Sequence, residues 1–221
     1  MPIWAEINND SLRHNMLAIR AFVPSNSKIL AVVKANAYGH GAVECSRVFL
    51  ENGADMLAVA TLSEAIELRV AGITAPILIL GYTSQVEAES ILRWNITPTV
   101  YTVECAKILS DATKKNGDII NIHIKLDSGL GRIGFQPNEA SIEAIDEIKR
   151  MQNINIEGIF THFALADSNK TYTMKQFNVF QNFLDGITKR GIRIPIKHVS
   201  NSAAIIDFPK YNLDMVRPGC I

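Results

Sequence analysis

The chain has 221 residues, of which 48% are hydrophobic and 20% are charged, and its formal net charge is +0 at pH 7. This composition is typical of a soluble globular protein; the neutral charge argues against binding to nucleic acid or an anionic membrane, and no apolar stretch is long enough for a transmembrane helix. The three cysteines, Cys45, Cys105 and Cys220, match no zinc-binding spacing, so we expect reduced thiols, no metal site and a cytoplasmic location.

Short apolar segments recur along the chain and predict eight strands. They cover about residues 28–34, 55–60, 76–80, 97–101, 119–126, 156–161, 195–199 and 213–217. A helix is expected ahead of the first strand, at about 10–22, and amphipathic helical patterns lie between most of the others.

The clearest helix covers 61–72, where Thr61 and Glu64 have the spacing of a capping box and a glycine ends the pattern. Similar patterns cover 137–151 and 171–191. Strands that alternate with helices indicate a parallel sheet, and eight of them favour a (β/α)8 barrel of the TIM type over an open doubly wound sheet.

A barrel places its chemistry at the carboxyl ends of the strands, whereas an open sheet concentrates it at a switch point. Unusual polar residues follow the predicted strands, as a barrel requires; they are Lys34, 125–132, His162, 200–202 and 217–219. The chain stops at Ile221, just after the eighth strand, with no helix to cover that strand. We therefore expect residues 1–221 to form one barrel domain.

Lys34 follows the buried strand at 28–34 and precedes a loop that contains Tyr38 and two glycines. A lysine at the end of a buried strand is poorly solvated, and burial favours the neutral amine that attacks aldehydes. The simpler interpretation is a lysine that extends to the surface.

Residues 121–134 combine a strand that carries Lys125 with a glycine-rich loop that carries Arg132. Glycines allow the backbone to approach a ligand, and an arginine can bind a carboxylate or phenolate with two hydrogen bonds. The loop matches no standard phosphate-binding motif, so a plain barrel turn is an equal alternative.

The segments after the last two strands favour an anion. Asn201 and Ser202 precede good helix formers, and a serine at a helix N-terminus suits phosphate, although it can equally be a simple N-cap. Arg217 ends the eighth strand, and Gly219 offers an unobstructed N–H group. His162 ends the sixth strand, where it could lie against a flat cofactor, hold Arg217 or simply pack.

With these motifs assembled, the chain resembles alanine racemase, a pyridoxal-phosphate enzyme of fold type III, along essentially all of its length. The segments that carry the resemblance are 31–41, 125–132, 161–164, 201–204 and 216–219. The resemblance implies a cytoplasmic enzyme that interconverts L-alanine and D-alanine, supplies D-alanine for the cell wall and acts as a homodimer.

The resemblance also assigns roles to individual residues. Lys34 would bind pyridoxal 5'-phosphate covalently and act as one of two catalytic bases. Around the cofactor phosphate the resemblance places Tyr38, Asn201, Ser202, Gly219 and Cys220. Arg217 would face the pyridine nitrogen, and His162 would support the ring and Arg217. Arg132 would contact the phenolic oxygen, and Lys125, which is carbamylated in many family members, would orient Arg132.

Alanine racemases carry a C-terminal β-domain that supplies the second base, a tyrosine, to the partner's site. We therefore expect the 221 residues to represent the barrel domain and to be poorly active alone. Two alternatives stay open: a single-domain pyridoxal-phosphate-binding protein without racemase activity, and a serine or broad-specificity racemase. A related decarboxylase barrel is disfavoured, because such enzymes usually place an acidic residue where Arg217 stands.

Overall fold

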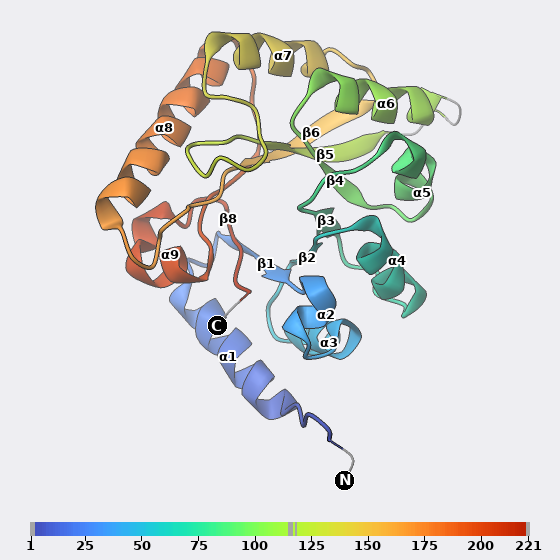
Figure 1. The fold of residues 1–221 in the computed structure, drawn as a ribbon, viewed down its shortest axis with the longest axis vertical. Coiled ribbons are helices and arrows are strands. Elements are labelled where there is room, and N and C mark those ends of the chain that lie inside the picture. Colours follow the sequence, from blue (N-terminus) through green and yellow to red (C-terminus); the bar gives the residue numbers. More distant parts are fainter. Residues whose placement is uncertain (1–2, 115–116, 118, 220–221) are drawn as a thin grey trace.

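A computed structural model describes residues 3–114, 117 and 119–219 of the chain. Its strands surround a common centre and most of its helices lie outside them (Figure 1). The strands are β1 (Lys28–Val32), β2 (Met56–Val59), β3 (Ile77–Ile79), β4 (Thr97–Val100), β5 (Ile120–Lys125), β6 (Ile154–Phe160), β7 (Ile196–His198) and β8 (Met215–Val216).

The eight strands form one parallel sheet in the order β7-β6-β5-β4-β3-β2-β1-β8. Backbone hydrogen bonds from Asp214 N–H to Lys197 O (3.1 Å) and from Arg217 N–H to Ser200 O (3.0 Å) join the two ends of this sheet. The result is a nearly closed barrel, which confirms the predicted (β/α)8 fold and all eight predicted strands.

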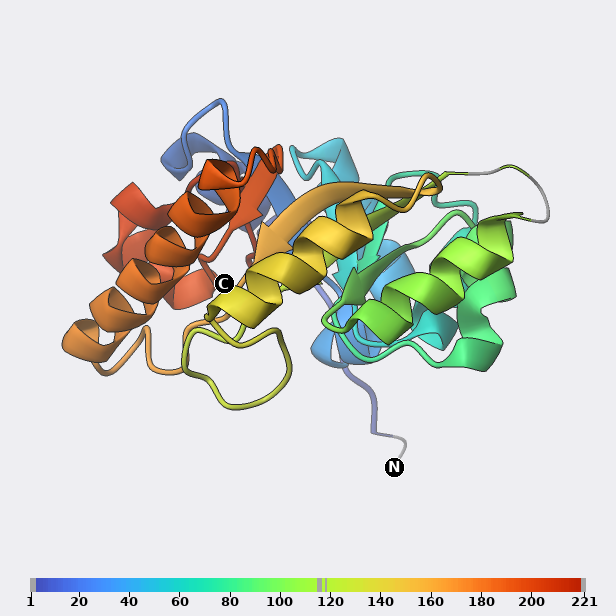
Figure 2. The ribbon, with the colours of Figure 1, turned by 90° about the horizontal axis from the view of Figure 1, so that it is seen from above.

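The helices cover the outside of the barrel, as the view from above shows for α6, α7 and α8 (Figure 2). They are α1 (Asn9–Phe22), α2 (Lys34–Tyr38), α3 (Ala42–Glu51), α4 (Leu62–Val70), α5 (Ala88–Arg93), α6 (Val103–Lys114), α7 (Glu139–Lys149), α8 (Lys170–Lys189) and α9 (Ser202–Asp207), with 3-10 turns η1 (Gln85–Glu87) and η2 (Pro209–Tyr211). Within the described part of the chain, no helix is long and apolar enough to cross a membrane.

Side-chain caps explain where several helices begin. The predicted capping box of Thr61 and Glu64 is present at α4, so this prediction is confirmed. Asparagine side chains cap the first turns of four other helices: Asn8 at α1, Asn138 at α7, Asn169 at α8 and Asn201 at α9.

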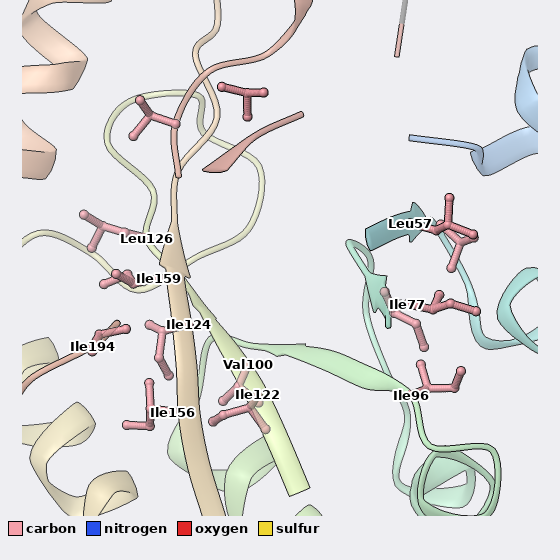
Figure 3. Packing of buried hydrophobic residues seen from close by; sticks show 14 of the residues in the cluster. Leu57, Ile77, Ile96, Val100, Ile122, Ile124, Leu126, Ile156, Ile159 and Ile194 are labelled. Atoms are coloured by element: carbon pink, nitrogen blue, oxygen red, sulfur yellow. The ribbon is translucent and has the colours of Figure 1, made fainter. Parts of the chain in front are cut away.

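Successive side chains of a strand point alternately outward to the helices and inward to the barrel interior, so the buried apolar residues form two clusters. The larger cluster lies between the strands and the helices, and Figure 3 shows part of it, including Ile122, Ile124 and Ile159. The smaller cluster fills one side of the barrel interior with Leu30, Val32, Met56, Ala58, Leu78, Ile196 and Met215. The alternate positions of β5 to β7 instead carry polar side chains, among them His123, Lys125 and His198, all buried. The barrel interior is therefore apolar beside β8, β1, β2 and β3 and at Ile196 in β7, and it is polar beside β5 and at His198 in β7.

Candidate active site

A cavity of about 740 Å³ opens among the segments that follow the strands at their carboxyl ends. Eight of the ten predicted site residues line it: Lys34, Tyr38, Arg132, His162, Asn201, Ser202, Arg217 and Gly219. Lys125 is buried behind the cavity wall, and Cys220 lies outside the described residues. The structure therefore brings most of the predicted site residues to one cavity, although they are far apart along the chain.

Lys34 is half-buried, so it keeps more contact with solvent than its position after a buried strand predicted. Its Nζ atom lies 5.9 Å from the centre of the Tyr38 ring. The backbone between these two residues is unusual, because Ala35, Asn36, Ala37 and Tyr38 all have φ values between 50° and 55°. The segment labelled α2 is thus a left-handed turn, a conformation that costs L-residues about 1–2 kcal/mol each.

Two side chains hold this left-handed turn in place. The Glu64 carboxylate accepts hydrogen bonds from Ala35 N–H (2.8 Å) and Ala60 N–H (2.6 Å), so it ties the turn to the start of α4. Asn36 Oδ1 accepts from Ala42 N–H (2.8 Å) at the start of α3. Strain of this kind persists only where the surroundings enforce it, and it is frequent at functional sites.

Tyr38, Ser202 and Gly219 meet on one wall of the cavity. The Gly219 N–H donates to Ser202 Oγ at 3.0 Å. A Cβ atom at Gly219 would lie 2.9 Å from the Tyr38 hydroxyl, so any larger residue would have to displace the Tyr38 side chain. Asn201, not Ser202, is the N-cap of α9, because its side chain accepts from Ala204 N–H (3.1 Å). The alternative interpretation of Ser202 as a simple N-cap is therefore wrong.

Arg217 lies at the base of the cavity and is only 4% exposed. Within the described residues, its guanidinium donates to His198 Nδ1 (2.9 Å), Thr161 O (2.8 Å) and Val199 O (3.0 Å). Burial, with a smaller contribution from Arg132, lowers the pKa of Arg217 to about 9, which still leaves it protonated at neutral pH. The histidine that holds Arg217 is thus His198, whereas the sequence interpretation gave this role to His162.

His162 lines the cavity, and its backbone carbonyl accepts a hydrogen bond from Gln176 Nε2 (3.2 Å). Burial lowers the pKa of its side chain to about 3, with help from Arg217 and the other nearby cations. The ring is therefore neutral at pH 7 and can lie beside a flat ligand without adding charge.

The loop that carries Arg132 is fixed from within by Asp127. Its carboxylate accepts hydrogen bonds from the N–H groups of Gly129 (3.0 Å), Leu130 (2.8 Å) and Gly131 (2.9 Å). Burial alone would raise the pKa of Asp127, but these N–H donors and Lys125 hold it below its usual value. Asp127 thus fixes the backbone conformation of the loop that carries Arg132.

Lys125 fastens the base of the same loop. Its Nζ atom donates to Leu126 O (2.8 Å) and Ile133 O (3.2 Å), and the residue is 1% exposed. Burial, followed by repulsion from Arg217, lowers its pKa to about 7. Lys125 therefore acts on Arg132 through the backbone beside it, and the lowered pKa makes its neutral amine accessible near pH 7.

The charges that line the cavity favour an anionic ligand. Lys34, Arg132 and Arg217 face a single carboxylate, Asp167. Among the described residues, no group of three or more histidine, cysteine, aspartate or glutamate side chains is placed to hold a metal ion.

Comparison with known proteins identifies the family. The family model described as "Alanine racemase, N-terminal domain" matches residues 7–221. The chain belongs to this alanine racemase family. It is 52% identical to an alanine racemase of Methanococcus maripaludis and 51% identical to one of Clostridium tetani, in each case over its whole length.

Solved alanine racemases share the fold. The Clostridium difficile 630 enzyme in complex with cycloserine superposes with a TM-score of 0.97 at 48% identity, and covers 100% of this chain. The Bacillus anthracis enzyme with bound L-Ala-P gives a TM-score of 0.91 at 34% identity over 99% of the chain. The chain spans only part of the length of these racemases. It corresponds to 59% of the M. maripaludis sequence and 57% of the C. tetani sequence, and to 61% and 58% of the C. difficile and B. anthracis structures.

Sequence reasoning missed several residues that shape this racemase-like site. The capping-box pattern predicts Glu64 only as a helix cap. It does not predict that Glu64 Oε1 accepts a hydrogen bond from Ala35 N–H. His198 was noted in the strand but given no role. Tyr82 and Asp167, which also line the cavity, follow strand ends but lie in no motif that marked them.

Proposed function

We propose that this chain is the cofactor-binding barrel of a pyridoxal-5'-phosphate-dependent alanine racemase, which interconverts L-alanine and D-alanine. The observation that supports this most directly is the cavity itself. Lys34, an amine that can bind an aldehyde, shares it with the Tyr38–Ser202–Gly219 wall and with the buried cation of Arg217. Membership of the alanine racemase family supplies the reaction class.

The residues present fit the cofactor in charge and in shape. Pyridoxal phosphate is an anion with a flat ring, and the cavity combines three cations with a neutral His162 and the Phe160 side chain. At Gly219 the backbone lies so close to Tyr38 that a side chain there would displace the Tyr38 hydroxyl from the wall where we place the phosphate. We assign the phosphate to Tyr38, Ser202 and the Gly219 N–H, with Asn201 as a neighbouring contact; Cys220, which the family resemblance also assigns to the phosphate, lies outside the described residues.

When bound, the cofactor would supply a conjugated ring that withdraws electrons from the substrate Cα and makes its proton acidic. Lys34 would hold the cofactor covalently and, once released, take or return the Cα proton on its own face. Arg132 would bind the phenolic oxygen and thereby orient the ring. Lys125, whose pKa is lowered to about 7, would react as the neutral amine to become carbamylated and would steady the Arg132 loop.

Arg217 would face the pyridine nitrogen as a hydrogen-bond donor. Arginine has no acceptor, and with a pKa of about 9 it keeps its proton at pH 7. A ring nitrogen that receives a hydrogen bond but no proton is a weaker electron sink. By keeping its proton, Arg217 would limit the electron withdrawal that the cofactor supplies, which would favour racemisation over transamination.

Racemisation needs a second base on the opposite face of Cα, which we place on another domain of the partner subunit in a homodimer. We further propose that the enzyme supplies D-alanine for the cell wall and works in the cytoplasm. Cys45 and Cys105 are free thiols, which fits a reducing compartment.

Borohydride trapping tests the central assignment. The chain is mixed with pyridoxal phosphate and reduced with borohydride, and the modified residue is located by peptide mapping. We expect the adduct on Lys34, its loss in Lys34→Ala, and its retention in Lys125→Met, which removes the second amine near the cavity. An adduct on any other residue, or no adduct in a folded chain, would overturn the proposal.

A further inference from the structure

Two buried histidines and a partly exposed glutamate continue the hydrogen bonding behind Arg217, away from the cavity. Arg217 Nη1 contacts His198 Nδ1 at 2.9 Å, His198 Nε2 contacts His123 Nδ1 at 2.9 Å, and His123 Nε2 contacts Glu157 Oε2 at 3.2 Å. The four residues come from β8 or its end, β7, β5 and β6, so the series crosses the polar half of the barrel interior. None of the roles assigned above uses His123 or Glu157.

The hydrogen-bond chemistry of the series permits one arrangement of protons. Arginine can only donate, so His198 Nδ1 must be unprotonated and the proton of a neutral His198 must sit on Nε2. His123 Nδ1 then has to accept that proton's hydrogen bond, which places the proton of His123 on Nε2. This last N–H points at Glu157, which as a carboxylate can only accept. Each donor therefore meets an acceptor in the order Arg217, His198, His123, Glu157.

A second proton on either histidine would break this order. A charged His123 would point an N–H at the N–H of His198, and a charged His198 would point one at Arg217. The surroundings oppose both events. Burial lowers the pKa of both histidines, and the positive charge of Arg217 lowers it further. Lys125 has the same effect on the pKa of His198, and Lys28 on that of His123. Glu157 partly offsets the decrease at His123. The hydrogen bond from His123 in turn lowers the pKa of Glu157, which keeps it a carboxylate.

The strands are built locally to accommodate the series. Pairing between β5 and β6 matches Ile122 with Ile156 but His123 with Gly158, so Glu157 is the extra residue of a β-bulge. Bulges redirect side chains and are frequent near active sites. A Cβ atom at Gly158 would lie 2.5 Å from the His123 ring, so glycine at this position leaves room for the imidazole. His198 is held from its face by Phe160, with ring centres 4.7 Å apart and an interplanar angle of 13°.

We propose that Glu157 and His123 are positioning residues, which fix the tautomer of His198 and through it the orientation of the Arg217 guanidinium at the base of the cavity. The consequence for cofactor chemistry rests on the function proposed above, whereas the proton arrangement itself does not. Glu157 and His123 would contribute to that function, because the orientation of the Arg217 guanidinium determines whether its remaining N–H groups can donate to the pyridine nitrogen of the cofactor.

The test follows the protons directly in the 221-residue chain, with and without pyridoxal phosphate. Nitrogen-15 NMR of labelled histidine and arginine distinguishes protonated from unprotonated ring nitrogens and reports exchange of the Arg217 N–H groups with water. The variants are Glu157→Leu, which removes the final acceptor, and Glu157→Gln, which removes the charge but keeps an acceptor. Asn155→Leu is the matched control, since it deletes a hydrogen bond between the same two strands, Asn155 Nδ2 to Asn121 Oδ1 (2.7 Å), away from the series.

In the wild type we expect both histidines to be neutral and protonated on Nε2 at pH 7, because burial lowers the pKa of each ring. Glu157→Leu should mix the tautomers of both rings and speed Arg217 N–H exchange roughly tenfold, the effect of losing about one hydrogen bond's restraint. Glu157→Gln and Asn155→Leu should keep the wild-type signals. If Glu157→Leu does not fold, His123→Phe, which keeps a ring but ends the series, takes its place with the same expected effect at His198 and Arg217.

Two results would overturn the proposal: His198 protonated on Nδ1 in the wild type, or unchanged His198 and Arg217 signals in Glu157→Leu or, if that variant does not fold, in His123→Phe. A failure of the proposed function looks different. In that case the wild-type chain would show the expected tautomers yet give no cofactor adduct on Lys34, and the positioning of Arg217 by Glu157 and His123 would stand.

Discussion

Replacing Ala35 with glycine should stabilise the fold while weakening cofactor binding. Ala35 is exposed and has φ 52° and ψ 50° in the left-handed turn after Lys34. Its N–H donates to Glu64 Oε1 and its carbonyl accepts from Gly39 N–H, and a glycine keeps both bonds. The substitution thus removes the steric cost of the left-handed conformation and changes little else.

The expected gain is the difference between two opposing effects. An L-residue in this conformation costs about 1–2 kcal/mol, and glycine removes that cost. Glycine also adds freedom to the unfolded chain, which costs about 0.5–1 kcal/mol. At the midpoints of these two ranges, the net stabilisation is about 0.75 kcal/mol. Ala18→Gly is the matched control, because Ala18 is exposed within the right-handed helix α1, where the same change should destabilise by about 1 kcal/mol.

Thermal unfolding distinguishes the two variants by sign. For a chain of this size, 1 kcal/mol shifts Tm by about 2–4 °C, so Ala35→Gly should raise Tm by about 1–4 °C and Ala18→Gly should lower it by about 2–4 °C. Titration with pyridoxal phosphate should show weaker binding to Ala35→Gly, because a more flexible turn no longer presets Lys34 and Tyr38. If Ala35→Gly lowered Tm as much as Ala18→Gly does, the strained turn would not exist in solution.

Three further predictions concern the proposed chemistry. Ser202→Ala should weaken binding of pyridoxal phosphate by about 1.5–3 kcal/mol and leave pyridoxal binding nearly unchanged; equal losses in the two Kd values would show that the phosphate is elsewhere. Carbon-13 NMR with labelled CO2 should detect a carbamate on Lys125 that increases from pH 6 to pH 8, because the neutral amine becomes the majority form above a pKa of about 7; its presence in Lys125→Met would disprove the assignment. The 221 residues produced as a separate polypeptide should racemise alanine about two to four orders of magnitude more slowly than a full-length racemase, since one base is missing; comparable D-alanine formation would locate both bases within these residues.

The barrel could be predicted from sequence because each strand is a short apolar run bounded by a helix cap or a turn. The predicted strand at 28–34 is observed as Lys28–Val32 and the one at 156–161 as Ile154–Phe160, so the errors lie at the ends. The cavity lining could be predicted for the same reason. In a parallel barrel every strand ends on the same side, so a lysine, an arginine or a glycine just after a strand is brought to one rim regardless of its distance along the chain.

The left-handed turn and the buried series behind Arg217 could not be predicted in this way. Ala35 and Ala37 are strong right-handed helix formers, and their conformation comes from Glu64 and Asn36, which bond to backbone groups outside their own elements. The role of Glu157 depends on a bulge, which shifts the pairing of β6 against β5 and leaves no trace in the apolar pattern.

The partners of Arg217 explain why a cation is kept in the barrel interior. A buried arginine is usually paired with a carboxylate, which cancels much of its field. Within the described residues, Arg217 forms no ion pair; its three hydrogen bonds go to a neutral imidazole and two carbonyl oxygens. The nearest acidic residue in the series, Glu157, is separated from it by two histidine rings. Arg217 is therefore held in one orientation by groups without formal charge, so its positive field remains directed at the cavity, where the proposed function requires a strong donor that does not release its proton.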